Sequence, residues 1–225
     1  MYTNTLLCQS VSDRIEASIR DGTWAVNEKI PSERILAQQY HVSRTVIREA
    51  IKKLNEKKLI INRPGKGNYV SRPDNSTLTT QFKSLLNYHQ IPIEDLIEAR
   101  EELEVMIGRR AVKNITRTQL KEISALYRRM DDFLDDHQSF SRCDYDFHVK
   151  LAECSGNISL KMIFISLYTV TGNENYAAVT GTRQIREHAQ REHAAILTAL
   201  KRRSPRNLEQ AIHRHMQCIR GHILP

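Results

Sequence analysis

Apolar residues recur at helical spacing through the first 56 residues of the chain, and this periodicity restricts the fold more than any other feature. It predicts one helix over residues 6–20, which Asp21-Gly22 can end, and a second that begins at Pro31-Ser32. Ser43 is a suitable N-cap for a third helix, because its hydroxyl can accept a hydrogen bond from an unpaired backbone N–H. The side chains expected to face inward are Leu7, Val11, Ile15 and Ile19, then Ile35, Leu36 and Tyr40, and in the third helix Val46, Ile47, Ala50, Ile51 and Leu54.

The periodicity changes after Lys58. Residues 59–62 and 67–70 are β-prone runs, and the segment Arg63-Pro64-Gly65-Lys66 between them has the proline and glycine of a hairpin tip. Three helices followed by a hairpin within about 70 residues form the outline of a winged helix-turn-helix, whose recognition helix can enter the major groove of DNA.

From about residue 79 onward no segment is typical of a strand, and apolar residues at helical spacing predict about seven helices. Residues 71–76 lack periodicity and are typical of a linker. A chain of 225 residues is long enough for two modest domains. We therefore predict a mainly α protein with a winged helix-turn-helix domain over residues 1–72, a linker over 73–79 and an all-α helical bundle over 80–225.

The positive charge of the chain is concentrated in its first third. Residues 1–73 carry 13 Lys and Arg against 7 Asp and Glu, which is a net +6 of the total +8. Nine basic side chains lie between residues 44 and 72, where only two acidic ones occur. Together with the helix-turn-helix outline, this excess predicts binding to double-stranded DNA. The alternative is a basic helix and hairpin that are only a solvated surface.

The residues expected to contact DNA lie at the start of the third helix and at the hairpin tip. Arg44, Thr45 and Arg48 occupy the first turn and a half of that helix, from which side chains reach base edges or flanking phosphates. The hydroxyl of Ser43 or Thr45 can donate to phosphate. The hairpin adds two glycines that allow close approach of the backbone and two cations, namely Gly65, Gly67, Arg63 and Lys66.

Three motifs in this region carry a family resemblance: Ile30-Pro31-Ser32-Glu33-Arg34-Ile35-Leu36-Ala37, Val42-Ser43-Arg44-Thr45-Val46-Ile47-Arg48-Glu49-Ala50 and Arg63-Pro64-Gly65-Lys66-Gly67-Asn68-Tyr69-Val70. Over nearly all of residues 8–71 the chain resembles the GntR family of bacterial regulators. The resemblance implies DNA contact by the wing and by Arg34, Ser43, Arg44, Thr45 and Arg48, of which charge density alone does not indicate Arg34. The family usually has Pro-Gly where this chain has Val26-Asn27, and commonly has glycine where it has His41, so the loop geometry could differ at these two places.

In the second half of the chain, four side chains that can bind metals share apolar helix faces. Asp144 and His148 are four residues apart and project from one face, and His193 and His215 each lie on the apolar stripe of their own helix. Burying one polar group without a partner costs about 1–3 kcal/mol, so these groups need each other, water or a metal. Three imidazoles and a carboxylate suit a divalent ion such as zinc, nickel, manganese or iron(II). Each histidine taken alone is more often a hydrogen-bonded core residue.

Five motifs extend the resemblance: Glu98-Ala99-Arg100-Glu101-Glu102-Leu103-Glu104, Asp144-Tyr145-Asp146-Phe147-His148, Gly156-Asn157, Glu192-His193-Ala194-Ala195-Ile196-Leu197 and Ala211-Ile212-His213-Arg214-His215-Met216. Residues from about 93 to 220 resemble the FCD effector domain of the FadR-like GntR subgroup, an antiparallel helical bundle. The resemblance implies that Asp144, His148, His193 and His215 hold the metal and that the effector is a small organic acid. Arg100 is a candidate for the effector carboxylate, because a guanidinium can bind it bidentately. The alternative for Arg100 is an ion pair with Glu104 or another acid.

The four cysteines, at positions 8, 143, 154 and 218, form no C-x-x-C pair and indicate reduced thiols rather than a disulfide framework or a zinc knuckle. The start of the chain lacks a basic segment followed by an apolar core, and no apolar run reaches about 18 residues. These features predict a cytoplasmic protein that does not bind a membrane.

The sequence thus predicts a transcription regulator that binds a palindromic operator as a homodimer. The resemblance implies that it is a repressor and that it responds to a small carboxylate effector. Two alternatives stay open. A metalloenzyme acting on a small organic acid could use the same ligands with open coordination positions. A purely structural metal could stabilise the bundle without binding an effector.

Overall fold

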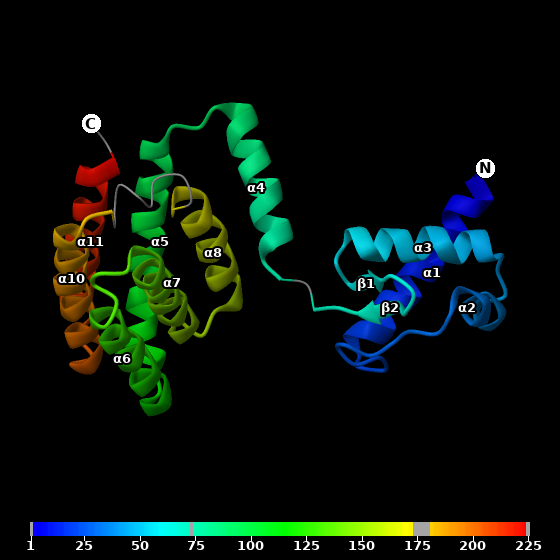
Figure 1. Cartoon of the computed structure of the whole chain (residues 1–225), viewed down its shortest axis with the longest axis horizontal. Coiled ribbons are helices and arrows are strands. Elements are labelled where there is room, and N and C mark those ends of the chain that lie inside the picture. The colour runs from blue at the N-terminus through cyan, green and yellow to red at the C-terminus, as the bar shows by residue number, and fades with distance from the viewer. Residues whose placement is uncertain (1, 73, 173–180, 224–225) are drawn as a thin grey trace. The chain divides into compact units, whose positions relative to one another are not determined.

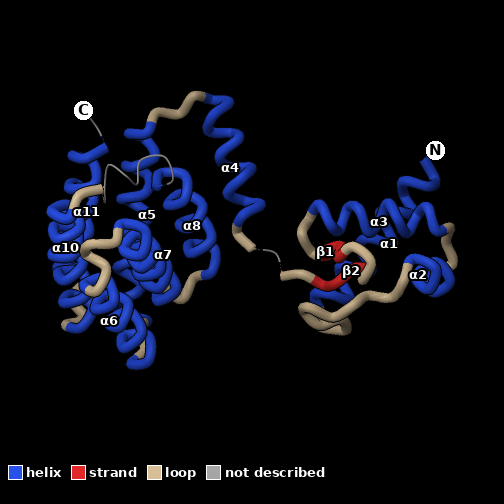
Figure 2. Tube along the Cα trace, viewed as in Figure 1, coloured by secondary structure: helices blue, strands red, loops and turns tan. Residues whose placement is uncertain are grey.

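The structure is a computed structural model that describes residues 2–72, 74–172 and 181–223. The chain divides into two compact units, Met1–Thr77 and Leu78–Pro225. Among the described residues the strands are confined to one hairpin and all other regular elements are helices (Figure 2), which confirms the predicted fold class. None of these helices combines the length and the apolar character needed to span a membrane.

The described residues of the first unit form three complete helices and a two-stranded antiparallel hairpin (Figure 1). The elements are α1 (Tyr2–Arg20), α2 (Glu33–Tyr40), α3 (Arg44–Glu56), β1 (Ile60–Arg63) and β2 (Gly67–Val70). Ser43 caps α3 as predicted, since its hydroxyl accepts a hydrogen bond from the N–H of Val46. Ser32 caps α2 in the same way, accepting from the N–H of Ile35 at the predicted start of that helix.

The core of the first unit contains most of the residues predicted to face inward. Two of those predictions are wrong, because Leu7 is 41% exposed and Ile35 is 37% exposed. Cys8 and Leu36, the next residues along the chain, are buried in the same helices. Successive helical residues lie about 100° apart, so a position at the margin of the apolar stripe can fall outside the core. The correctly predicted buried residues include Val11, Ile15, Val46, Ile47, Ala50, Ile51 and Leu54.

The hairpin has a third partner that the sequence did not predict. Strands β1 and β2 pair in the register that sets Ile60 opposite Val70. The N–H of Val70 also donates to the carbonyl of Glu28 at 2.8 Å, and the N–H of Ile30 donates to the carbonyl of Asn68 at 3.0 Å. The segment between α1 and α2 therefore holds the wing against the body of this unit.

The described part of the second unit contains seven helices and no strand. Helix α4 begins at Ser76, inside the segment 73–79 predicted as a linker, and residue 73 lies outside the described residues. The helices are α4 (Ser76–His89), α5 (Ile93–Asn114), α6 (Arg117–Asp131), α7 (His137–Cys154), α8 (Ile158–Gly172), α10 (Arg183–Lys201) and α11 (Pro205–Ile223).

Helix α5 is the central element of the second unit, since it packs against α7, α8 and α11. Gly108 allows a close approach of α5 to α11, because a Cβ at this position would lie 2.7 Å from Cδ1 of Ile212. Helix α10 packs on α11 and on α6, and α6 packs on α7. The inward faces of α5, α7, α10 and α11 therefore share one interior. All four cysteines of the chain are free thiols, and three of them are buried.

Candidate metal centre and DNA-binding surface

The first turns of α3 present an exposed polar surface. Arg44, Thr45 and Arg48 are all exposed, and the Ser43 hydroxyl caps the helix by accepting from a backbone N–H at 3.3 Å. The guanidinium of Arg48 lies 3.3 Å from a carboxylate oxygen of Glu33, and both side chains are partly exposed. Exposed pairs of this kind contribute at most about 1 kcal/mol, so a DNA phosphate can replace Glu33 at little cost.

The wing presents charge on a backbone that favours glycine. Gly65 and Gly67 have φ of +70° and +103°, a region that other residues rarely adopt. Arg63 and Lys66 are exposed beside them, and Arg34 is exposed on α2. The residues predicted to contact DNA are therefore at the surface of the first unit, with Gly67 half-buried. Their contact with DNA stays a prediction.

The two departures from the usual GntR pattern both fall on left-handed backbone. Asn27 has φ of 69° and His41 has φ of 54°. His41 closes α2 as its C-cap, with its N–H directed to carbonyls of the last turn. Glycine adopts this conformation without strain, whereas a residue with a Cβ does not, which explains why glycine is usual there. The loops keep the glycine-type geometry despite the substitutions.

The four predicted metal ligands come together inside the second unit. Asp144 and His148 lie on α7, His193 on α10 and His215 on α11, and all four side chains are buried. One ring nitrogen from each of the three histidines lies within 4.8 Å of the others. The Nε2 atoms of His148 and His193 are 3.2 Å apart. Oδ1 of Asp144 lies 3.1 Å from Nε2 of His193 and 3.8 Å from Nε2 of His148.

Polar groups on the outer side of the cluster contact two of the histidine rings. Nδ1 of His148 lies 3.2 Å from Oε2 of Glu104, a distance that suits an ion pair although the two atoms are not aligned for a good hydrogen bond. Nδ1 of His193 lies 3.4 Å from Oε1 of Gln190. Both rings therefore turn Nε2 toward the common centre and Nδ1 away from it.

Burial and pairing compete in setting the pKa of the two buried acids. Burial raises the pKa of Asp144, but its hydrogen bond to His193 and the nearby charges outweigh this and hold the pKa well below its usual value. Burial also raises the pKa of Glu104, which the Arg100 guanidinium and His148 together hold below its usual value. Both carboxyl groups are consequently ionised at neutral pH.

The histidines respond in the opposite sense. Burial lowers the pKa of His193, even though its contact with Asp144 favours the charged form. Burial, with the repulsion of neighbouring histidines, holds the pKa of His215 well below its usual value. Because both rings are neutral at pH 7, their lone pairs are available to a metal ion without the loss of a proton.

This cluster fits a divalent metal ion on two observations. Ligand atoms about 2.0–2.1 Å from a tetrahedral ion lie about 3.3 Å from one another, and the contacts of 3.1, 3.2 and 3.8 Å between His148, His193 and Asp144 bracket that value. In addition, His215 is buried, and neither of its ring nitrogens has a hydrogen-bond partner among the described residues. Buried polar atoms are rarely left so, and a metal ion would satisfy one of them.

Arg100 occupies the interior rather than an open pocket. It is 4% exposed, and its Nε donates to Oε1 of Glu104 at 2.7 Å. Its guanidinium also lies 4.2 Å from the centroid of the Tyr168 ring. The ion pair with Glu104, which was the alternative to effector binding, is therefore formed. The effector role of Arg100 stays a prediction.

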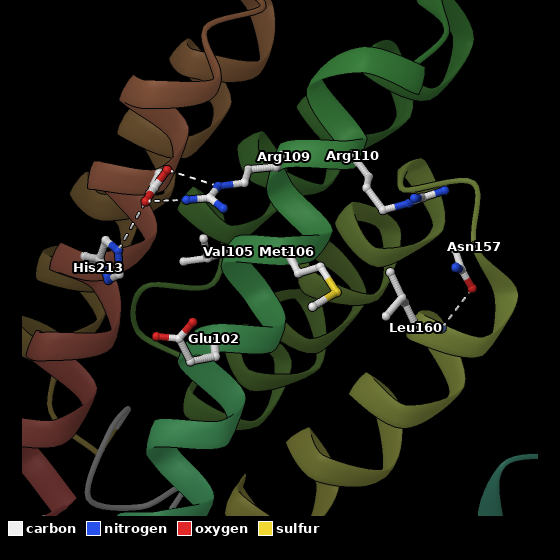
Figure 3. Close-up of a pocket in the computed structure, with 9 residues that line it drawn as sticks. Glu102, Val105, Met106, Arg109, Arg110, Asn157, Leu160 and His213 are labelled. Atoms are coloured by element: carbon white, nitrogen blue, oxygen red, sulfur yellow. Dashed lines mark hydrogen bonds and ion pairs between the residues drawn. The ribbon is translucent and has the colours of Figure 1, made fainter.

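A separate surface cleft of about 440 Å³ lies between α5, α8 and α11 (Figure 3). On one side Arg109 donates two hydrogen bonds to Glu209, at 3.1 and 2.8 Å, and so links α5 to α11. His213, on the same side, contacts Glu209 and Glu101. None of the predicted metal ligands lines this cleft, so it is distinct from the histidine cluster.

Both units match family models. The model of bacterial regulatory proteins of the gntR family matches residues 7–70, and the FCD domain model matches residues 95–217, which is more than half of the chain. The chain belongs to the GntR family. As a GntR-family protein with an FCD domain it is a DNA-binding transcription regulator and not an enzyme, which excludes the metalloenzyme alternative.

The GntR-family protein is similar to curated regulators over almost its whole length. The HTH-type transcriptional repressor NanR of Citrobacter rodentium is 28% identical over 221 residues, with 95% of this chain and 84% of the relative covered. The Uxu operon regulator of Haemophilus influenzae is 26% identical over 214 residues, with 93% and 79% covered. A solved GntR structure from Streptococcus agalactiae has the same fold, with a TM-score of 0.76 at 24% identity and 95% and 99% of the two chains covered.

Sequence reasoning did not assign three residues that the fold of this GntR-family protein places around the cluster. Glu104 contacts His148, and Gln190 contacts His193. The hydroxyl of Tyr168 donates a hydrogen bond to Asp144. Gln190 is itself fixed, because its amide nitrogen donates to the Tyr127 carbonyl at 2.7 Å and to Asp131 at 2.9 Å. The sequence does hold a signal for Glu104. This charged residue lies at helical spacing from Ile97 and Ile107, within the buried apolar stripe of α5.

Proposed function

We propose that this GntR-family protein is a repressor that binds a palindromic operator as a homodimer and changes its operator affinity when a small carboxylate effector binds at a divalent metal. The observation that carries the proposal is the buried cluster of His148, His193 and His215, in the same chain as a helix α3 whose first turns expose arginine side chains. The NanR relatives are named transcriptional repressors, and we extend that activity to this chain.

We attribute operator binding to a DNA-binding domain over residues 1–72. Arg44 and Arg48 at the start of α3 can form bidentate hydrogen bonds with guanine, and Ser43 and Thr45 can donate to phosphates. The wing approaches a neighbouring groove or backbone, since its glycines leave room and its cations are exposed. The proposed contacts are Arg34, Ser43, Arg44, Thr45, Arg48, Arg63, Gly65, Lys66 and Gly67.

We attribute effector binding and dimerisation to residues 80–225, joined to the first domain by a linker over 73–79. Asp144, His148, His193 and His215 would hold the ion, for which zinc, nickel and manganese are the candidates. When bound, such an ion supplies a Lewis-acidic centre that can accept an effector carboxylate at a position not filled by the protein. The four side chains are buried, and in this dry setting the carboxylate would interact strongly with the ion.

Dimerisation follows from the symmetry of operator recognition, because a two-fold protein reads two half-sites. The second unit has apolar side chains left exposed on α5 and α8: Met106 at 52%, Ile158 at 68% and Ile163 at 51%. Isolated exposure of this kind is common at protein surfaces, so these side chains permit an interface between two copies without indicating one. Light scattering coupled to size-exclusion chromatography at micromolar concentration tests the dimer directly.

The experiment that tests the proposed function is fluorescence anisotropy with DNA from the protein's own upstream region and with a scrambled duplex, at two salt concentrations. We expect the upstream DNA to bind about 10³-fold more tightly or better. Equal and steeply salt-dependent binding to both duplexes would reduce the first unit to a basic surface. A panel of small carboxylates, added with and without Zn²⁺, should then include one that shifts operator affinity only in the presence of the metal.

A further inference from the structure

Two buried contact paths connect the ligands on α7 to residues on other helices, and both lead to Arg100. In the first path, Nε of Arg100 donates to Oε1 of Glu104 at 2.7 Å, and Oε2 of Glu104 lies 3.2 Å from Nδ1 of His148. The side chains of Arg100, Glu104 and His148 are 5%, 1% and 0% exposed. Since Nε2 of His148 faces His193, Glu104 contacts the ring on its outer side while the inner nitrogen faces the centre.

The second path runs through an aromatic ring. The Arg100 guanidinium lies 4.2 Å from the centroid of the Tyr168 ring, which is within the range of a cation–π contact. The Tyr168 hydroxyl donates to Oδ2 of Asp144, and Oδ1 of the same carboxylate lies near His193 and His148. A carboxylate with one oxygen fixed in this way presents the other oxygen in a defined orientation.

We propose that Arg100, Glu104 and Tyr168 are positioning residues that form a second layer around the metal centre and fix the orientation of His148 and Asp144. The inference rests on the proposed function, because it concerns two ligands of the proposed metal. A ligating histidine nearly always donates its other ring N–H to a carboxylate, a carbonyl or a water, and this partner sets the tautomer and the ring orientation. Glu104 occupies that place for His148, and Arg100 keeps the buried Glu104 charge compensated.

The same contacts indicate that Arg100 positions Glu104 and Tyr168 rather than binding the effector itself. Its guanidinium already lies between Glu104 and Tyr168, on α5 and α8. An effector carboxylate that took the guanidinium would leave the ionised Glu104 buried without its cation, which proteins avoid. Helix α5 supplies no predicted ligand, and the contact of Glu104 with His148 connects this helix to the centre.

The decisive variant is Glu104→Gln, measured in the full-length protein and again in a His148→Ala background. The readouts are the Kd for Zn²⁺, from competition with a chromophoric chelator, and the visible spectrum of the Co²⁺-loaded protein, which reports ligand geometry. In the otherwise unchanged protein, Glu104→Gln should weaken Zn²⁺ binding about 10- to 100-fold. In the His148→Ala background it should change the Kd by less than about threefold, because the effect passes through His148. Glu98→Gln, an exposed change on the same helix, is the matched control and should leave the Kd unchanged.

Two further variants keep the test valid if Glu104→Gln unfolds the domain by leaving Arg100 without its acid. The double variant Arg100→Gln/Glu104→Gln removes both charges, and should keep the helical circular dichroism spectrum while losing Zn²⁺ affinity to a similar extent. Tyr168→Phe removes only the hydroxyl that fixes Asp144, and should weaken Zn²⁺ binding about tenfold and alter the Co²⁺ spectrum. Direct effector contact by Arg100 predicts the reverse, namely unchanged Zn²⁺ affinity in the double variant with loss only of the response to carboxylates.

Each outcome supports or overturns the second layer. Wild-type Zn²⁺ affinity in folded Glu104→Gln and Arg100→Gln/Glu104→Gln proteins overturns it and leaves the metal-dependent regulator intact. An equal loss of affinity with and without His148 also overturns it, because Glu104 then acts by some other route. A wild-type protein that binds neither Zn²⁺, Ni²⁺ nor Mn²⁺ would overturn the proposed function and the second layer together.

Discussion

Acidification of the metal-free protein should destabilise its second unit, because two of the histidines in the cluster resist protonation. The pKa of His193 is lowered and that of His215 is held well below its usual value, in both cases chiefly by burial. In the unfolded chain both rings titrate near pH 6.5, so below this pH the unfolded state binds more protons than the native state. Their contribution to stability is therefore fully present above about pH 6.5 and is lost as the pH falls.

The magnitude follows from the number of rings that stay neutral. Each ring that is neutral in the native state at pH 5.5 lowers the free energy of unfolding by about 1.2 kcal/mol between pH 7 and pH 5.5, so two rings give up to about 2.5 kcal/mol. The pKa values of Asp144 and Glu104 are lowered, so these acids contribute stability above about pH 4 that is lost only in stronger acid. The loss between pH 7 and pH 5.5 is therefore assigned to the histidines.

The assay is urea unfolding with excess chelator, followed by far-UV circular dichroism at several pH values. The chain has one tryptophan, Trp24, which packs on the core of the first unit, so its fluorescence separately reports the unfolding of that unit. His215→Leu should reduce the loss by up to about 1.2 kcal/mol, whereas the exposed change His222→Gln should leave it unchanged. A second unit whose stability is constant or rises on acidification, or an undiminished loss in His215→Leu, would refute the reasoning.

Three further perturbations test other parts of the molecule. Arg44→Ala or Arg48→Ala should weaken specific operator binding by about 1–3 kcal/mol in anisotropy titrations without changing the circular dichroism spectrum. The control Arg20→Ala, an exposed change on α1, should leave operator binding unchanged. Operator affinity like that of the wild type in either α3 variant would show that α3 does not have the proposed role. Chelation should abolish the response of operator binding to carboxylates with little change in the melting temperature of the protein. A structural metal predicts a different result, namely no carboxylate response even before chelation and a large drop in melting temperature after it. His41→Gly should raise the free energy of unfolding of the first unit by about 0.5–1 kcal/mol, because relief of left-handed strain exceeds the added entropy of the unfolded chain; a destabilised variant would contradict this.

The first unit was largely predictable because its signals are local. Ser43 caps α3 as predicted, since the identity of a cap depends only on neighbouring backbone groups. The errors at Leu7 and Ile35 concern the width of the buried face, which depends on what packs against the helix. The pairing of Glu28 and Ile30 with β2 was not predictable, because this short segment lacks the alternation of apolar and polar residues that would set its register.

For the metal centre, the sequence predicted which helix faces point inward but not which side chains contact one another. Apolar stripes indicate that His193 and His215 point inward, and the resemblance to FCD domains implies that they share one site with His148. The 3.2 Å approach of His148 to His193 depends on how α7 and α10 are set by other helices, and no local pattern contains that information. The contact of Tyr168 with Asp144 likewise joins α7 to α8, so spacing within either helix could not reveal it.

The arrangement of ligands and second layer suggests how a small effector can change the bundle. The proposed ligands come from α7, α10 and α11, and their neighbours Glu104 and Tyr168 come from α5 and α8, so one centre selects the relative placement of five helices. An effector can shift the balance between two such placements only by the difference in its affinity for them. Allosteric couplings are typically about 1–3 kcal/mol, which is comparable to one buried hydrogen bond to a charged group. The coupling between effector and operator is therefore expected to be sensitive to single contacts such as Tyr168 to Asp144, even where the four ligands are intact.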